Sequence, residues 1–79
     1  MKVTVKLFSS LRDLYPDYDP EHGRVVDLPD PACVEDLIRI LGIPESKAPV
    51  VTCNGRILKR TDPLTGGSLL HIFQPVAGG

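Results

Sequence analysis

One amphipathic stretch, residues 29–44, limits the fold most, because it predicts a single main helix between segments with strand alternation. Its apolar residues recur at helical spacing, at Val34, Leu37, Ile38 and Leu41. Pro31 follows Asp30, and a proline suits the first turn of a helix. Gly42 fits a left-handed cap at the end of the helix, and Pro44 cannot continue it. The stretch therefore predicts one helix with one apolar face.

The other apolar segments are typical of β-strands. Residues 2–8 alternate, which places Val3, Val5 and Leu7 on one face and Thr4, Lys6 and Phe8 on the other. Further strands are expected at 24–28, at 69–74 and within 49–58, which is predicted to be a hairpin. The hairpin turns at Asn54-Gly55, because both residues tolerate positive φ.

Residues 9–23 separate the first two strands. A short helical turn is expected over 11–15, with Ser9 or Ser10 as its cap. Pro16 and Pro20 then predict an irregular loop, which is also rich in acidic residues.

The order strand, strand, helix, strand, short strand, strand favours a two-layer α+β domain. It is the order of the β-grasp, or ubiquitin-like, fold. We therefore expect a mixed sheet of four to five strands, with the first and last strands adjacent and the helix packed on one face. Residues 1–75 are predicted to form this domain, and residues 76–79 a flexible, extended Gly-Gly tail.

Composition excludes several classes of function. The chain has 79 residues, which is one domain at most, and its net charge of −1 gives no basis for binding nucleic acid or a membrane. No apolar run is long enough for a transmembrane helix, and residues 1–8 alternate as in a strand, so no signal peptide is expected. Two cysteines, Cys33 and Cys53, make neither a disulfide framework nor a zinc site. Cysteines without such a framework are typical of a reducing compartment, so a cytoplasmic location is expected, although the sequence leaves a single bridge between the two open. His22 and His71 have no third ligand at metal spacing, so no metal is expected.

The sequence finishes on Gly78-Gly79, behind an apolar strand and Pro75. Glycine has no side chain, so such a tail can pass through a channel that any Cβ would block. Val76 to Gly79 would span roughly 13 Å when extended, at about 3.3 Å per residue. The alternative is a frayed end with no role.

Four stretches resemble the ubiquitin-like sulfur carriers, above all the small subunit of molybdopterin synthase (the MoaD-like group within the ThiS and MoaD proteins). They are "LFSSLRDL", "VEDLIRIL", "CNGRIL" and "DPLTGGSLLHIFQPVAGG", which together span nearly the whole chain. One departure is Gln74, where that family often has a second proline before Pro75.

The resemblance implies a mechanism in which this chain is a carrier and not an enzyme. An E1-like adenylating enzyme of the MoeB or ThiF type would use ATP to activate the Gly79 carboxylate, and a sulfur donor protein would convert it to a thiocarboxylate. Val76, Ala77 and Gly78 would carry Gly79 into the large subunit of molybdopterin synthase. Catalytic residues belong to the partners, and no cofactor is expected on this chain.

A partner-binding patch is expected on the face of the sheet opposite the helix. Alternation places Phe8 and Phe73 on that face, and the family pattern adds Ile57. The alternative is that both phenylalanines pack under the long loop as a small second core.

Other functions remain open. The same chemistry serves sulfur carriers for thiamine or cysteine synthesis, and an adenylated Gly79 would also support a ubiquitin-like protein modifier. A plain interaction module with an inert tail is a third class.

Overall fold

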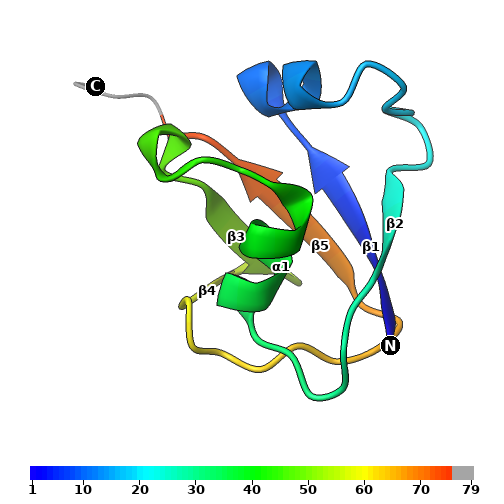
Figure 1. Cartoon of the computed structure of the whole chain (residues 1–79), viewed down its shortest axis with the longest axis vertical. Helices are drawn as coiled ribbons and strands as arrows, with labels where there is room; N and C mark the ends of the chain where they lie inside the picture. Colours follow the sequence, from blue (N-terminus) through cyan, green and yellow to red (C-terminus); the bar gives the residue numbers. More distant parts are fainter. Residues whose placement is uncertain (76–79) are drawn as a thin grey trace.

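The computed structural model describes residues 1–75, and residues 76–79 lie outside the described part. Five strands form one sheet, and one α-helix and two short 3-10 helices accompany it (Figure 1). The elements are β1 Lys2–Leu7, η1 Ser9–Leu14, β2 Arg24–Asp27, α1 Val34–Leu41, η2 Glu45–Lys47, β3 Val50–Cys53, β4 Arg56–Leu58 and β5 Leu69–Phe73. Every predicted strand is present, with bounds that differ by one residue or less.

The sheet is mixed, with strand order β2-β1-β5-β3-β4. β1 runs parallel to β5, with Val5 opposite Leu70 and Leu7 opposite Ile72, and the other neighbours are antiparallel. The predicted adjacency of the first and last strands is therefore confirmed, and so is the β-grasp architecture. β5 is the central strand, between β1 and β3, so the last strand is held on both sides up to its C-terminal end.

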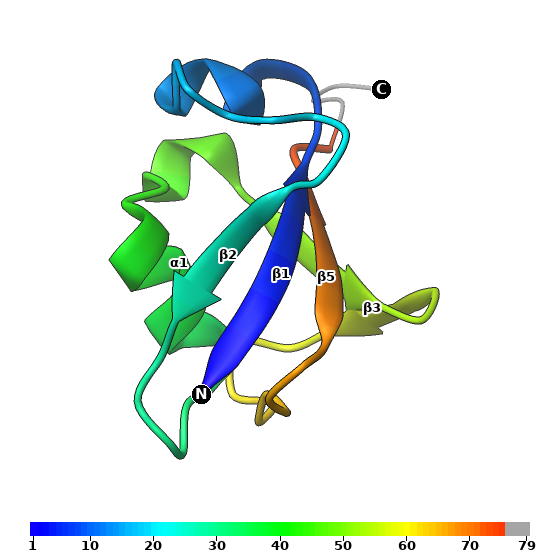
Figure 2. The ribbon, with the colours of Figure 1, turned by 90° about the vertical axis from the view of Figure 1, so that its right-hand side faces the viewer.

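α1 covers one face of the sheet, and the core lies between them (Figures 1 and 2). The sheet contributes every second residue to this core, as the alternation predicts, and α1 contributes its apolar stripe. The largest fully buried side chains are Leu7, Leu11, Leu37, Leu70, Ile72, Val3, Val5, Val34 and Val51. Tyr15 and Tyr18, from the segment after η1, pack against this core at its edge.

α1 begins later than the sequence predicts, at Val34, with Cys33 as its N-terminal cap. The prediction that Pro31 occupies the first helical turn is wrong. Residues 32–35 instead bond to the loop before β5: the N–H groups of Val34 and Glu35 donate to the carbonyls of Asp62 and Arg60, at 3.1 and 2.9 Å. The loop therefore satisfies N–H groups that a helix start leaves unpaired.

The end of α1 is as predicted. Gly42 adopts φ 74°, and its N–H donates to the carbonyls of Ile38 and Arg39. A left-handed residue with this bonding ends a helix, and glycine adopts it without a steric penalty. No helix within residues 1–75 is long and apolar enough to span a membrane.

Candidate functional site

The chain leaves the sheet at a fixed point next to η1. Phe73 is paired with Val50 of β3. Gln74 follows directly, and its Oε1 accepts a 2.6 Å hydrogen bond from the Ser10 hydroxyl. Pro75, the last described residue, is exposed. The start of the tail is therefore held from two sides, by β3 and by η1. The predicted tail residues Val76, Ala77, Gly78 and Gly79 lie outside the described part.

η1 differs from the helical turn that the sequence predicts. It starts at Ser9, is a 3-10 helix, and has no side-chain cap. Ser10 does not cap it, because its hydroxyl donates to Gln74. Sequence reasoning missed this contact, because nothing in the pattern brings together two residues so far apart in the chain.

A cationic side chain stands at the same end of the sheet. Arg12 lies in η1, two residues after Ser10, and its Nε donates to the Leu7 carbonyl at 3.0 Å. Its guanidinium lies 6.0 Å from the centre of the Phe8 ring, within reach of a cation–π contact. The exit of the tail is thus bordered by one positive charge and one aromatic ring.

The two predicted phenylalanines lie at this end, on the face of the sheet away from α1. Phe8 directly follows β1 and is 37% exposed, and its ring meets the His71 ring edge-on at 5.6 Å. Phe73 is half-buried, two residues beyond His71 on β5. Tyr15 and Tyr18, from the segment after η1, pack against the main core, and neither phenylalanine is among the side chains that pack against it.

Ile57 lies on the same face, on a strand two positions from that of Phe73 and three positions from β1, which Phe8 follows. It is 68% exposed on β4, opposite Thr52, and Thr52 is opposite His71. Phe8 contacts His71, and Phe73 lies two residues beyond His71 on the same strand, whereas Thr52 and His71 separate Ile57 from both phenylalanines. We call Phe8, Phe73 and Ile57, with His71 and Thr52, the outer-face patch.

Two further apolar residues share this face at the other end of the sheet. Leu69 on β5 and Val25 on β2 are both exposed, and both are paired with Thr4. Sequence reasoning did not single them out, although alternation from Leu70 and Val26 places both on the outward face.

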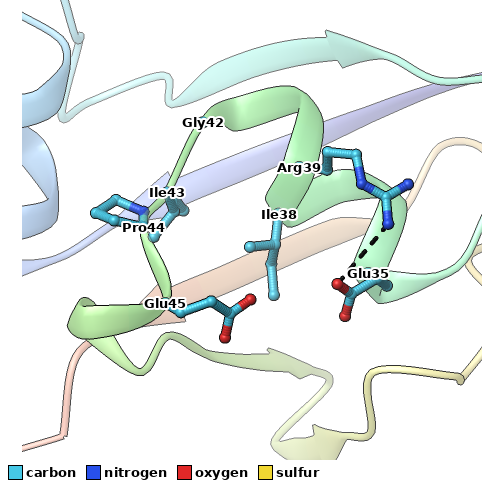
Figure 3. A pocket seen from close by; sticks show the side chains of 7 residues that line it. All are labelled: Glu35, Ile38, Arg39, Gly42, Ile43, Pro44 and Glu45. Carbon is cyan, nitrogen blue, oxygen red and sulfur yellow. Dashed lines mark ion pairs between the residues drawn. The ribbon is translucent and has the colours of Figure 1, made fainter.

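Within residues 1–75, one cavity beside α1 offers no charged side chain that is free of an ion pair. It has a volume of about 340 Å³, lies beside the end of α1 and is lined by Glu35, Arg39 and Glu45 among others (Figure 3). Each of these charged groups is already in an ion pair. Arg60 bonds Glu35 at 2.9 Å and Glu45 at 3.0 Å, and Arg39 lies 3.9 Å from Glu35. The hydrogen bond from Arg60 holds the pKa of Glu45 below its ordinary value. This cavity is a structural junction between α1, η2 and the loop before β5.

Within the described part of the chain, no group of three or more His, Cys, Asp or Glu side chains could hold a metal ion. His22 is bonded to Asp19 at 2.7 Å in the acidic loop, and His71 faces Phe8 on the outer face. The cysteines are free thiols, and Cys53 packs against the core.

The sequence matches the model of the ThiS family over residues 5–79, so the chain belongs to this family. No curated protein matches it in sequence. The class is thus the ubiquitin-like sulfur carriers and modifiers of the ThiS and MoaD type, whose members work with E1-like enzymes and partner subunits. These small carriers are generally not catalysts themselves.

Solved structures share the fold over nearly the whole chain. A putative molybdopterin converting factor subunit 1 from Pyrococcus furiosus superposes with a TM-score of 0.76 and 26% identity, covering 96% of this chain and 99% of its own. SAMP1 from Haloferax volcanii gives a TM-score of 0.72 and 24% identity, with both chains fully covered. A structure of H. volcanii small archaeal modifier protein 1 gives 0.73 and 21%, covering 95% and 98%.

Proposed function

We propose that this chain is a sulfur carrier, charged as a thiocarboxylate at Gly79, and that it is the small subunit of a molybdopterin synthase. The observation that carries the proposal is the likeness to a putative molybdopterin converting factor subunit at 26% identity over nearly the whole of both chains. The Gly78-Gly79 tail supplies the group to be charged.

The chemistry at Gly79 needs three displacements. The carboxylate is a poor electrophile, so its oxygen first attacks the α-phosphorus of ATP and pyrophosphate leaves. A persulfide sulfur of the donor protein then attacks the acyl carbon and AMP leaves. A second thiol of the donor system reduces the resulting acyl disulfide, and the thiocarboxylate remains on Gly79. ATP and the catalytic groups belong to the activating enzyme in this scheme.

The described part of the chain contributes a defined origin for the tail. The bond from Ser10 to Gln74 and the pairing of Phe73 hold the chain until it leaves the sheet. In our proposal the outer-face patch and Arg12 bind the activating enzyme and then the large subunit, while Val76, Ala77 and Gly78 enter the partner's active site. A rigid origin limits the volume that Gly79 searches, which lowers the entropic cost of productive binding.

The match to the ThiS family model favours a second candidate, a carrier for another sulfur acceptor such as a thiamine or cysteine precursor. A protein modifier uses the same activated Gly79 but ends in attack by a lysine amine. All three functions need ATP and reducing conditions, so a cytoplasmic location belongs to each proposal.

Reconstitution with partners separates these candidates. The thiocarboxylated chain should convert a pterin precursor to its dithiolene product only with the large subunit of molybdopterin synthase. Transfer of sulfur to a thiazole-forming enzyme instead, with no pterin product, would reject the molybdopterin role. Isopeptide conjugates that end in Gly79 would favour the modifier.

A further inference from the structure

The sheet has an open edge at β2, which is the last strand on that side. Met1 and Leu28 exchange two hydrogen bonds of 2.7 Å, so they form a bonded pair of the antiparallel ladder. Bonded pairs recur at every second residue of an antiparallel ladder. The backbone N–H and C=O groups of Val26 and Arg24 therefore point toward β1, where they face Val3 and Val5. The N–H and C=O groups of Val25 and Asp27 therefore point away from β1, toward the open edge.

Contacts of β1 support this assignment. The N–H of Thr4, opposite Val25, donates to Ser68 at 2.9 Å, and the carbonyl of Lys2, opposite Asp27, accepts from Gly67 at 2.7 Å. Both bonds point toward the β5 side, as the alternation requires. The open edge thus presents backbone donors and acceptors at two successive outward positions, which is the template for an added strand.

A groove runs beside this edge, between β2 and the end of α1. Its volume is about 210 Å³, and its walls include Val26, Ile40 and Leu41 (Figure 2 looks onto this side). Ile40 is 51% exposed on α1. The groove is smaller than the roughly 300–1,000 Å³ of small-molecule sites, and its size suits one or two side chains. Its lining is mixed, with Arg24, Asp27 and Tyr15 beside the apolar residues.

One end of the groove is cationic. Arg24 lies 4.6 Å above the Tyr15 ring, and its ion pair with Asp17 is loose, at 3.7 Å from an exposed carboxylate. When the flat face of a guanidinium stacks on a ring, its N–H groups lie in the plane of the guanidinium and can still donate to an anion. Tyr15 lines the same groove, and its buried hydroxyl has no hydrogen-bond partner among the described residues. Burial raises the pKa of this hydroxyl, so it remains a donor.

We propose that the edge of β2 binds an extended peptide of a partner protein, in which an acidic residue and an apolar residue are separated by one position. The peptide adds a strand beside Val25 and Asp27. Side chains of a strand alternate, so the peptide residues opposite Arg24 and Val26 both point toward the groove. The acidic one binds Arg24, and the apolar one packs against Val26 and Ile40. β1 separates this edge from β5, where the tail leaves the sheet, and the proposal does not depend on the sulfur chemistry.

A second copy of this chain is a poorer occupant of the edge. If Val25 of one copy paired with Asp27 of the other, Arg24 would face Leu28, which has no charge. If the pairing were centred on Asp27, two carboxylates would meet. The cationic end of the groove is therefore not matched by β2 of another copy.

The test is an NMR titration of the isotope-labelled protein with two end-blocked peptides, Thr-Val-Thr-Glu-Thr and its reverse. Two peptides are needed because an added strand can run parallel or antiparallel to β2. Binding should shift the amides of residues 24–27 and 39–41 and slow hydrogen exchange at Val25 and Asp27. Replacing glutamate with glutamine should weaken binding by up to about fivefold, as for an exposed ion pair. The Arg24→Gln protein should bind the glutamate and glutamine peptides with equal affinity.

Val25→Pro tests the added strand itself. It removes an N–H that points to the open edge, so pairing with β1 is kept, and proline is tolerated on edge strands. Affinity should fall about threefold to tenfold, the worth of one hydrogen bond. Leu69→Ala, on the same face but away from the edge, is the control and should bind normally.

Three results would overturn the proposal: no shifts at millimolar peptide, shifts confined to the outer-face patch, or equal affinity for the glutamate and glutamine peptides. Concentration-dependent dimerisation through residues 24–27, seen by sedimentation and lost in Val25→Pro, would assign the edge to a second copy and also reject it.

Discussion

The Ser10 hydroxyl donates a 2.6 Å hydrogen bond to the side-chain carbonyl of Gln74, across 64 positions of sequence. This contact ties the first turn after β1 to the residue where the chain leaves β5. It lies next to the pairing of Phe73 with Val50, so it defines where the tail begins.

Ser10→Ala should lower the free energy of unfolding by about 0.5–1.5 kcal/mol, because a partly buried hydrogen bond is lost and the Gln74 carbonyl is left without it. Chemical denaturation measures this change. Ser46→Ala, at an exposed serine of η2, is the matched control and should change stability by less than about 0.5 kcal/mol. Equal losses in the two variants would contradict a role for the Ser10–Gln74 contact.

The core of the fold predicts a larger effect. Leu37→Ala on α1 should destabilise the protein by about 2–5 kcal/mol, since Leu37 is fully buried and its removal leaves a cavity. Ile40→Ala on the same helix should cost far less, because half of that side chain is exposed. Thermal or urea unfolding compares the two. A similar cost at both positions would mean that the described packing of α1 on the sheet is wrong.

Stability should fall at acidic pH in a window set partly by Asp36. The hydrogen bond from the Cys33 backbone N–H, and then the Cys33 thiol, holds the pKa of Asp36 below its ordinary value. A carboxyl with a lowered folded pKa stabilises the fold above its unfolded pKa, about 3.9, and this contribution is lost as pH falls through the folded value.

Asp36→Asn should therefore flatten the dependence of unfolding free energy on pH below about 4. Asp30→Asn, at an exposed carboxyl in the segment before α1, is the control. If the Asp36 variant keeps the full slope of the parent, the capping contact between Asp36 and Cys33 does not act in solution.

The outer-face patch predicts a change in partner recognition without a change in folding. Phe8→Ser or Ile57→Ser should reduce kcat/KM for adenylation by the activating enzyme about tenfold, as expected for the loss of an interface anchor. Ile40→Ser, an exposed isoleucine on α1, should leave the rate unchanged. Initial rates of pyrophosphate release give the comparison. Equal losses at Ile40 and Phe8 would argue against the patch as the docking surface.

Much of the fold follows from local pattern. Strict alternation in β1 and β5 sets which face of each strand is buried, and the Asn54-Gly55 turn fixes the β3–β4 hairpin. The start of α1 does not follow, because the bonds that decide it come from Asp62 and Arg60, far along the chain. Local sequence cannot show such partners, and for that reason the prediction that Pro31 lies in the first turn of the helix was wrong.

Part of the candidate site could likewise be predicted from the sequence, and part could not. Outward placement of Phe8, Phe73 and Ile57 follows from alternation, but which polar residues lie between Ile57 and the phenylalanines depends on the strand order. The Ser10–Gln74 contact and the stacking of Arg24 on Tyr15 join distant segments, so only the structure reveals them. The chemical role of Gly79 rests on sequence and family, because it lies outside the described residues.

Intact mass after activation tests the central claim most directly. The purified chain would be incubated with an adenylating enzyme of the family, ATP and a sulfur donor, alongside a variant that lacks Gly79. We predict a mass gain equal to one sulfur replacing one oxygen, in the parent chain alone and only with ATP. An unchanged mass, under conditions that charge a known carrier of the family, would contradict the assignment of this chain as a sulfur carrier.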